Sequence, residues 1–215
     1  MPEVLTLPKE VSALVRSIFS TARDLGYIGP APVDVQIERS LAFTVIAHPA
    51  RLALDLGSGG GLPGLVLALA WRDTDWYLVD SSHKRTEWLK SAVISLGLAD
   101  SCHVVCERAE DVGRSRLRAM FDLVTARSFG PPGPTAECAA PLLRVGGELV
   151  VAEPPQPTER RWPSPGLDEL GISWVATEAV DTPAGPVNLS RLVARSECPQ
   201  RYPRRVGVPF KRPLF

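Results

Sequence analysis

The sequence is poor in the residues that hold metal ions or build disulfide frameworks. It contains four cysteines and three histidines. No two of the cysteines stand at the C-x-x-C spacing of a zinc site or a redox pair. We therefore predict neither a bound metal nor a fold held together by disulfides.

Long apolar runs are also missing. No stretch approaches the ~18 apolar residues that a membrane span needs. The first ten residues include acidic side chains and lack the uninterrupted apolar core of a signal peptide. The sequence therefore predicts a cytoplasmic protein with no membrane partner.

Neither sign of charge is in excess, since 24 Lys and Arg side chains balance 24 Asp and Glu side chains. A nucleic acid partner would therefore have to bind a local basic patch, because the whole molecule does not attract a polyanion. The length of 215 residues suits a single α/β domain with small appendages. We favour a monomer.

What the sequence does have is an alternation of strand-like and helix-like segments. Residues 1–50 carry two amphipathic helical patterns and are expected to form an N-terminal helical cap. In residues 51–200, apolar runs such as RLALDL, DWYLVD, FDLVTA and GGELVVAE alternate with helical patterns, which predicts a parallel sheet covered on both faces. The late runs ISWVATEAV and LSRLVAR are typical of an antiparallel pair, and residues 201–215 form a basic tail on or beside this domain.

The stretch LDLGSGGGLPG, residues 54–64, follows the first predicted strand. Its five glycines indicate a backbone that turns tightly and comes close to another group. Asp80 closes the next strand, where a carboxylate can accept hydrogen bonds from ribose hydroxyls. Because ligands bind beyond the carboxyl ends of parallel strands, these features predict an adenosine-containing cofactor.

Two cofactor classes share this plan, and a tight turn without any ligand is a third possibility. Gly59, Gly61 and Gly64 satisfy the G-x-G-x-x-G pattern of dinucleotide-binding proteins. That pattern begins directly after its strand, however, and the residue in that place is Gly57. The D-x-G-x-G-x-G spacing that begins at Asp55 instead resembles motif I of class I S-adenosylmethionine-dependent methyltransferases.

Further segments indicate which family of methyltransferases the chain resembles. They are the LPG of the loop, the LVDSSHKRTEWL that follows, the triplet RAE, the ARS after the fourth strand and the tail YPRRVGVPFKRPL. Together they resemble the glucose-inhibited division B family, whose members methylate a guanine N7 in 16S ribosomal RNA. The resemblance covers residues 35–153 and the last part of the chain.

The resemblance implies a Rossmann-like class I methyltransferase fold, with a mostly parallel seven-stranded sheet and S-adenosyl-L-methionine as the cofactor. Arg127 and Ser128 would position the reacting groups. Phe129, next to them, is a candidate for stacking on the target base, with a core phenylalanine as the alternative; for Glu110 the alternative is a solvated helix start. The residues expected at the cofactor are Asp55, Gly57, Gly59, Gly61, Leu62, Asp80, Ala109, Glu110 and Arg127.

Guanine N7 carries an exposed lone pair and no proton. Its methylation therefore needs no general base, and we assign no catalytic acid or base. The enzyme has to align the nitrogen, the methyl carbon and the sulfur and to exclude water, so positioning supplies much of the acceleration.

The tail supplies the local positive charge that an RNA partner requires. Residues 201–215 contain five basic residues and no acidic one, with aromatic residues between them. Arg204, Arg205 and Lys211 match the basic C-terminal motif of the family. The expected partner is 16S ribosomal RNA or the small ribosomal subunit, and the alternative is a tail that packs back on the domain.

Some positions depart from the family pattern and mark a divergent member. The family reads His-x-x-Asp-Ser-Leu where this chain has QIERSL from Gln36, and it has lysine and glycine where this chain has Glu153 and Pro154. Two other functions therefore stay open. One is a paralogue that N-methylates a small heteroaromatic molecule, and the other is a non-catalytic protein that binds RNA or an adenosine ligand.

Overall fold

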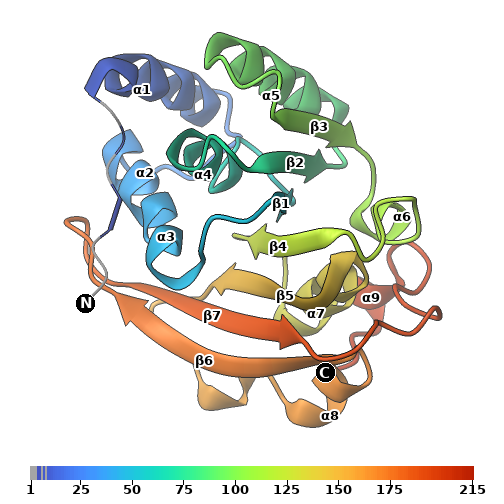
Figure 1. The fold of residues 1–215 in the computed structure, drawn as a ribbon. Coiled ribbons are helices and arrows are strands. Elements are labelled where there is room, and N and C mark those ends of the chain that lie inside the picture. The colour runs from blue at the N-terminus through green and yellow to red at the C-terminus, as the bar shows by residue number, and fades with distance from the viewer. Residues whose placement is uncertain (1–3, 6, 8) are drawn as a thin grey trace.

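The computed structural model describes residues 4, 5, 7 and 9–215, and its centre is a seven-stranded sheet (Figure 1). The strands lie in the order β3-β2-β1-β4-β5-β7-β6. Strand β7 is antiparallel to both its neighbours, and the pairs from β3 to β5 are parallel. The strands are β1 (Leu52–Leu56), β2 (Asp75–Asp80), β3 (Cys102–Cys106), β4 (Phe121–Ala126), β5 (Leu143–Ala152), β6 (Ile172–Val180) and β7 (Val187–Ala194).

Helices precede the sheet and connect most of its strands. Among the described residues, no helix is long and apolar enough to cross a bilayer. Two short 3₁₀ helices cover Ala140–Leu142 and Glu159–Arg161. The α-helices are α1 (Lys9–Asp24), α2 (Val33–Leu41), α3 (Phe43–Ile46), α4 (Gly64–Ala70), α5 (His83–Ser95), α6 (Ala109–Val112), α7 (Pro132–Ala139), α8 (Ser164–Asp168) and α9 (Val208–Lys211).

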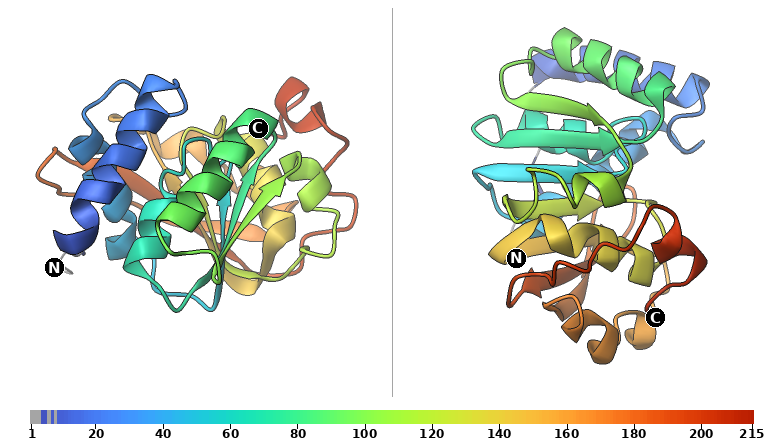
Figure 2. Two further views of the ribbon diagram at one scale, coloured as in Figure 1. Left: turned by 90° about the horizontal axis from the view of Figure 1, so that it is seen from above. Right: turned by 90° about the vertical axis from the view of Figure 1, so that its right-hand side faces the viewer.

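The sheet separates two buried apolar clusters. Side chains of α1 to α5 join the first cluster, and those of α6 to α8 join the second. Neighbouring strand residues such as Ala53 and Leu54 enter different clusters because successive side chains of a strand point to opposite faces. Figure 2 shows the resulting layers, with helices on both sides of the sheet.

The predicted fold class and the order of the strands along the chain are confirmed. The largest difference in a strand boundary is at β5, which begins at Leu143, ahead of the predicted run GGELVVAE. Leu143 pairs with Phe121, and the register then shifts before Leu123 pairs with Glu148. An apolar pattern does not reveal this early start, since Arg144 and Val145 are exposed.

The order of strands reverses between β1 and β4. From β1 the chain proceeds to β2 and β3 on one side, and β4 and β5 lie on the other. All five strands are parallel, so their carboxyl ends meet at one edge of the sheet. A ligand is expected in the crevice at this reversal, where the glycine loop leaves β1.

Candidate active site

The glycine loop between β1 and α4 lies against two other parts of the chain. Gly57 has a φ of +72°, and a Cβ built on it would lie 2.5 Å from Cδ2 of Phe129. A Cβ on Gly60 would lie 2.4 Å from Cγ2 of Ile28, in the connection between α1 and α2. Close packing of protein on the loop therefore accounts for two of the glycines that the sequence analysis related to a ligand.

Asp80, at the end of β2, holds this loop in place. Its Oδ2 accepts a hydrogen bond from the Gly59 N–H at 2.9 Å, and its Oδ1 accepts one from the Ser82 N–H at 2.8 Å. The guanidinium of Arg85 lies 3.6 Å from Oδ2. Asp80 lines a hollow although it is only 6% exposed, so its carboxylate is both fixed by the protein and open to a ligand.

Asp55 lies beneath the loop, not beside a hollow. It is 1% exposed, and its two carboxylate oxygens accept hydrogen bonds from the Thr125 hydroxyl at 2.8 Å and the Gly64 N–H at 3.2 Å. Burial raises the pKa of Asp55 to about 6, against the lowering effect of these hydrogen bonds. The structure thus gives Asp55 a supporting role: it joins the ends of β1 and β4 to the start of α4.

The raised pKa of Asp55 predicts a pH-dependent stability that Asp55→Asn removes. Asparagine keeps both hydrogen bonds, because its carbonyl can accept from Gly64 and its amide can donate to Thr125. The unfolded carboxyl loses its proton near pH 4 and the folded one only near pH 6, so the contribution of Asp55 to wild-type stability falls as pH rises from 4 to 6.5. We expect this fall, relative to Asp55→Asn, to be on the order of 2 kcal/mol by urea unfolding across this pH range. Parallel stability curves for the two proteins would contradict it.

Arg127 ties helix α2 to the carboxyl end of β4. Its guanidinium donates hydrogen bonds to the Ser40 hydroxyl at 3.1 Å, to the Gln36 carbonyl at 3.3 Å and to the Gln36 side chain. Burial, aided by the charge of Arg39, lowers the pKa of Arg127 to about 10, so Arg127 stays charged at neutral pH. Gln36, which the sequence analysis noted only as a departure from the family, is therefore part of the site.

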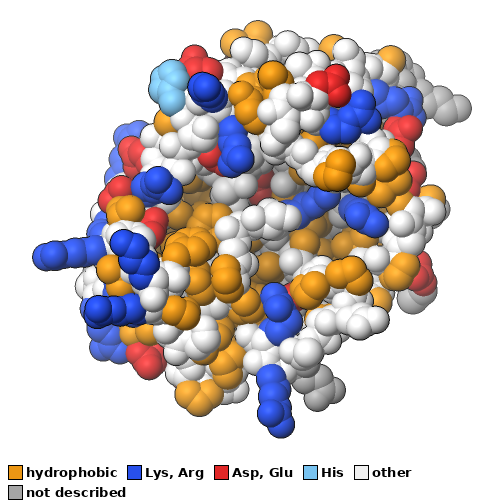
Figure 3. Space-filling view, turned by 180° about the vertical axis from the view of Figure 1, so that it is seen from behind, with side chains coloured by type: hydrophobic (Ala, Val, Ile, Leu, Met, Phe, Trp, Pro, Cys, Tyr) orange, Lys and Arg blue, Asp and Glu red, His pale blue; other side chains and the backbone are white. Residues whose placement is uncertain are grey.

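Three hollows meet at the turn 127–129 that follows β4. The first, of about 570 Å³, lies over the ends of β2 and β3; the second, of about 540 Å³, lies between the glycine loop and residues 26–31; the third, of about 400 Å³, lies over the ends of β4 and β5. Ser128 lines all three. Figure 3 shows a hollowed face with apolar side chains inside it and basic side chains around it. A molecule that extends from the first hollow into the second therefore passes the opening of the third.

Most of the residues expected at the cofactor line the first two hollows. Asp80, Ala109 and Glu110 line the first, and Gly59 and Leu62 line the second. Gly57 lines both, and Arg127 lines the second and the third. Asp55 and Gly61 line none of the three. The connection 26–31, which the sequence analysis did not single out, supplies one wall of the second hollow.

Arg204 has a partner within the protein. Its backbone N–H and its Nε donate to Oε1 of Glu137 at 2.8 Å, and its Nη2 donates to Oε2 at 2.6 Å. The Glu137 side chain, on α7, is completely buried. The sequence analysis expected RNA as the partner of Arg204, but the structure shows the alternative, a tail that packs on the domain. Arg205 and Lys211 are exposed.

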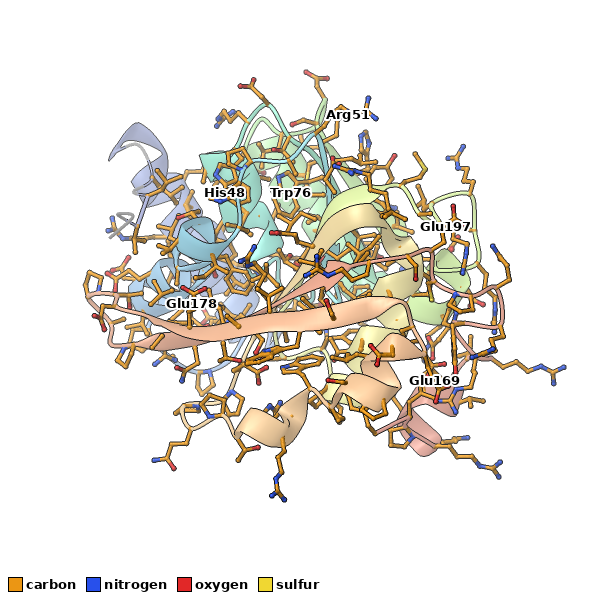
Figure 4. All side chains as sticks on the ribbon, turned by 60° about the horizontal axis from the view of Figure 1, so that its bottom comes forward. His48, Arg51, Trp76, Glu169, Glu178 and Glu197 are labelled. Carbon is orange, nitrogen blue, oxygen red and sulfur yellow. The ribbon has the colours of Figure 1, made fainter. Side chains whose placement is uncertain are left out.

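The described residues of the site form no arrangement typical of a metal centre or of histidine catalysis. Among the described residues, no group of three or more His, Cys, Asp or Glu side chains is placed to hold a metal ion. His48 and Arg51, labelled in Figure 4, lie just before β1, at the amino end of that strand, and they line a different hollow from the three described above. No histidine is among the described residues that line these hollows.

The strand order with β7 reversed, the glycine loop after β1 and the acid at the end of β2 define a class I S-adenosylmethionine-dependent methyltransferase. The fold is shared with an O-methyltransferase from Bacillus cereus, solved in complex with SAH, at 15% identity and a TM-score of 0.62, covering 88% of this chain and 93% of that one. It is also shared with the antibiotic-resistance methyltransferase Kmr, at 20% identity and a TM-score of 0.54, covering 74% and 93%.

The chain belongs to the GidB family, rRNA small subunit methyltransferase G, whose model matches residues 34–159. A relative from Syntrophomonas wolfei named ribosomal RNA small subunit methyltransferase G is 37% identical over 189 residues, which cover 86% of this chain and 87% of the relative. A relative of the same name from Synechococcus is 36% identical over 172 residues, covering 78% and 68%. The predicted family, the methyltransferase activity and the cofactor S-adenosylmethionine are confirmed.

Proposed function

We propose that this methyltransferase transfers a methyl group to a guanine N7 in the 16S ribosomal RNA of the small subunit. Its relatives are named for small-subunit ribosomal RNA. The predicted cytoplasmic location belongs to the same proposal. The observation that carries the choice of acceptor atom is the chemistry of the third hollow.

The third hollow offers no free general base. Among the described residues that line it, Glu153 is the only carboxylate. Its Oε1 accepts hydrogen bonds from Trp162 at 2.6 Å and Ser190 at 2.7 Å, and its Oε2 accepts one from Arg161 at 2.6 Å. An acceptor that must first lose a proton would find no group to take it. Guanine N7, with a lone pair and no proton, suits such a site.

The first two hollows fit S-adenosylmethionine, which supplies a methyl group activated by a sulfonium. Asp80 would accept hydrogen bonds from the ribose hydroxyls. Glu110 would accept a hydrogen bond from the adenine amino group, and the adenine would lie beside Ala109. The backbone of Gly57 and Gly59, free of side chains, would admit the rest of the cofactor into the second hollow. The two hollows share Gly57, Arg85 and Ser128, so one extended ligand can occupy both.

The turn 127–129 would position the reacting groups. Arg127 is fixed by Gln36 and Ser40 and stands between the second and third hollows, so it can hold the target base or the cofactor without moving. Phe129 is half-buried: it packs on Gly57 and also lines the third hollow. Phe129 can therefore pack on the glycine loop and also support the target base. These are the two roles, core residue and stacking residue, that the sequence left open for it.

Basic residues at the third hollow and on the tail would contact the RNA backbone. Arg39 and Arg161 line this hollow, and Arg205 and Lys211 are exposed on the tail. Glu153, which replaces a family lysine, does not oppose an RNA ligand, because its carboxylate is completely buried and paired with Arg161. Glu153 in place of the family lysine is therefore only weak support for a small-molecule substrate.

Transfer of labelled methyl from S-adenosylmethionine tests this function. The acceptors to compare are small ribosomal subunits that lack the modification, naked 16S ribosomal RNA, and free guanosine with a set of small heteroaromatic bases. We expect incorporation into the subunit or its RNA and none into the free bases. Label in the small molecules alone would favour the paralogue, and no label in any acceptor would contradict the proposal.

Replacing Arg205 and Lys211 together by alanine should weaken RNA binding and reduce its salt dependence. Each lost phosphate contact should lower the slope of log affinity against log salt by roughly 0.7 to 0.9. RNA affinity measured across a salt series checks this. Arg72→Ala, exposed between α4 and β2, is the control and should leave the slope unchanged. If the slope of log affinity against log salt is unchanged in the double variant, these two tail residues do not contact the RNA.

A further inference from the structure

The first hollow is closed on one side by residues from the far end of the sequence. We call residues 203–212 the C-terminal segment. Val206, Gly207, Phe210 and Lys211 of this segment line the first hollow together with Asp80 and Glu110. Residues about a hundred positions apart therefore face the same space.

Direct contacts join this segment to the cofactor side of the sheet. The Gly207 N–H donates a hydrogen bond to Oε1 of Glu110 at 2.8 Å. The ring of Phe210 meets the ring of Phe129 edge to face, with centroids 5.6 Å apart and planes at 64°. A Cβ on Gly130 would lie 2.7 Å from Cε1 of Phe210. The segment is thus seated on α6 and on the turn after β4.

Anchors hold the chain on both sides of these residues. Before the segment, the guanidinium of Arg118 donates hydrogen bonds to the carbonyls of Cys198 at 2.6 Å and Tyr202 at 2.7 Å. Within it, Arg204 pairs with the buried Glu137, and its Nη2 also donates a hydrogen bond to the carbonyl of Arg212 at 2.7 Å, beyond these residues. The residues that line the first hollow are therefore held as a fixed wall.

We propose that the C-terminal segment is part of the cofactor site and that Phe210, with Val206, covers the adenine of the bound cofactor. Phe210 is 44% exposed and Val206 is 46% exposed, so both present apolar surface to a hollow that is also lined by charged groups such as Asp80, Arg85 and Arg108. A flat purine has apolar faces and a polar edge. Its faces match these two side chains, and its edge matches the free oxygen of Glu110.

This proposal rests on the cofactor of the proposed function and does not depend on its RNA acceptor. It assigns the tail a task within the catalytic domain in addition to RNA contact. Anchoring of the tail and affinity for the cofactor would therefore change together, since loosening the segment removes one wall of the adenosine site.

Calorimetric titration with S-adenosylhomocysteine tests the wall directly. Phe210→Ala should raise the dissociation constant about tenfold, on the scale of a lost contact between an aromatic side chain and a base. The loss should be the same for 5′-methylthioadenosine, which carries the adenosine but not the amino acid. A loss confined to S-adenosylhomocysteine would mean that Phe210 acts through Phe129 on the amino acid end, and it would overturn the proposal.

Two further variants complete the test. Phe210→Leu keeps an apolar contact with Phe129 but lacks an aromatic face, so a severalfold loss is expected even if the alanine variant fails to fold. Met120→Ala is the control, since Met120 is also 44% exposed and lies next to the amino end of β4. Affinities within twofold of wild type for both Phe210 variants would overturn the proposal. If the Phe210 variants bind the cofactor more weakly but the enzyme transfers no methyl group to RNA, the proposed contact between Phe210 and the adenine stands. The proposal of an RNA acceptor is then rejected.

Discussion

Arg204→Ala is expected to lower the free energy of unfolding by about 3 to 5 kcal/mol, the scale of a buried ion pair that loses one partner. The variant would leave the Glu137 carboxylate inside the protein without the guanidinium that now donates to both its oxygens. Urea unfolding at neutral pH measures the effect. Although the loss concerns a single surface segment, it should destabilise the whole domain, because Glu137 belongs to α7, whose residues Ala136 and Cys138 are part of the second buried cluster.

The neighbouring Arg205 provides the matched control. Arg205 is exposed, and Arg205→Ala should change stability by no more than about 0.5 kcal/mol. Replacing Arg204 by methionine together with Glu137 by leucine should recover much of the loss, because no unpaired charge then remains buried. If Arg204→Ala were as stable as Arg205→Ala and lost as much RNA affinity, the expectation that Arg204 contacts RNA would be restored.

Asp80→Ala should weaken binding of S-adenosylmethionine by about 1.5 to 3 kcal/mol, or roughly 10- to 150-fold, the scale of hydrogen bonds lost to a charged group. Asp80 has two tasks in this account. It would receive the ribose hydroxyls of the cofactor, and it fixes the loop through the N–H groups of Gly59 and Ser82. Calorimetry on the purified variant measures the loss.

Asp100→Ala, at an exposed carboxylate after α5, is the control and should bind the cofactor as wild type does. Asp80→Asn separates the two tasks, because its carbonyl still accepts one hydrogen bond while the charge is gone. A smaller loss is expected there. The ribose assignment fails if Asp80→Ala unfolds part of the protein but the folded fraction binds the cofactor with wild-type affinity.

Local patterns were sufficient to predict the strands and the longer helices. Runs such as RLALDL and DWYLVD are apolar because β1 and β2 are covered on both faces, and their carboxyl ends fix where the glycine loop and Asp80 meet. The residues expected at the cofactor stand next to these strand ends in the sequence. Most of the residues proposed to bind the cofactor could therefore be identified from the sequence.

The remaining features depend on contacts between distant parts of the chain. Tyr27 and Ile28 approach the loop because Gly60 has no side chain, and a pattern within the loop does not reveal which segment comes close. The pairing of Glu137 with Arg204 likewise joins α7 to the tail. One signal was present: Glu137 is a single carboxylate in the otherwise apolar run TAECAAPLL. A buried carboxylate requires a partner, although the sequence does not say which basic residue provides it.

Identification of the methylated nucleoside tests the central claim most directly. Small ribosomal subunits that lack the modification would be incubated with the enzyme and labelled S-adenosylmethionine, and the RNA would be digested to nucleosides for chromatography with mass spectrometry. We expect one labelled product, 7-methylguanosine, because the third hollow would hold the base beside the turn 127–129 and its described residues offer no free group to remove a proton. Label in a ribose 2′-O-methyl group, or in a base nitrogen that must first lose a proton, would contradict it.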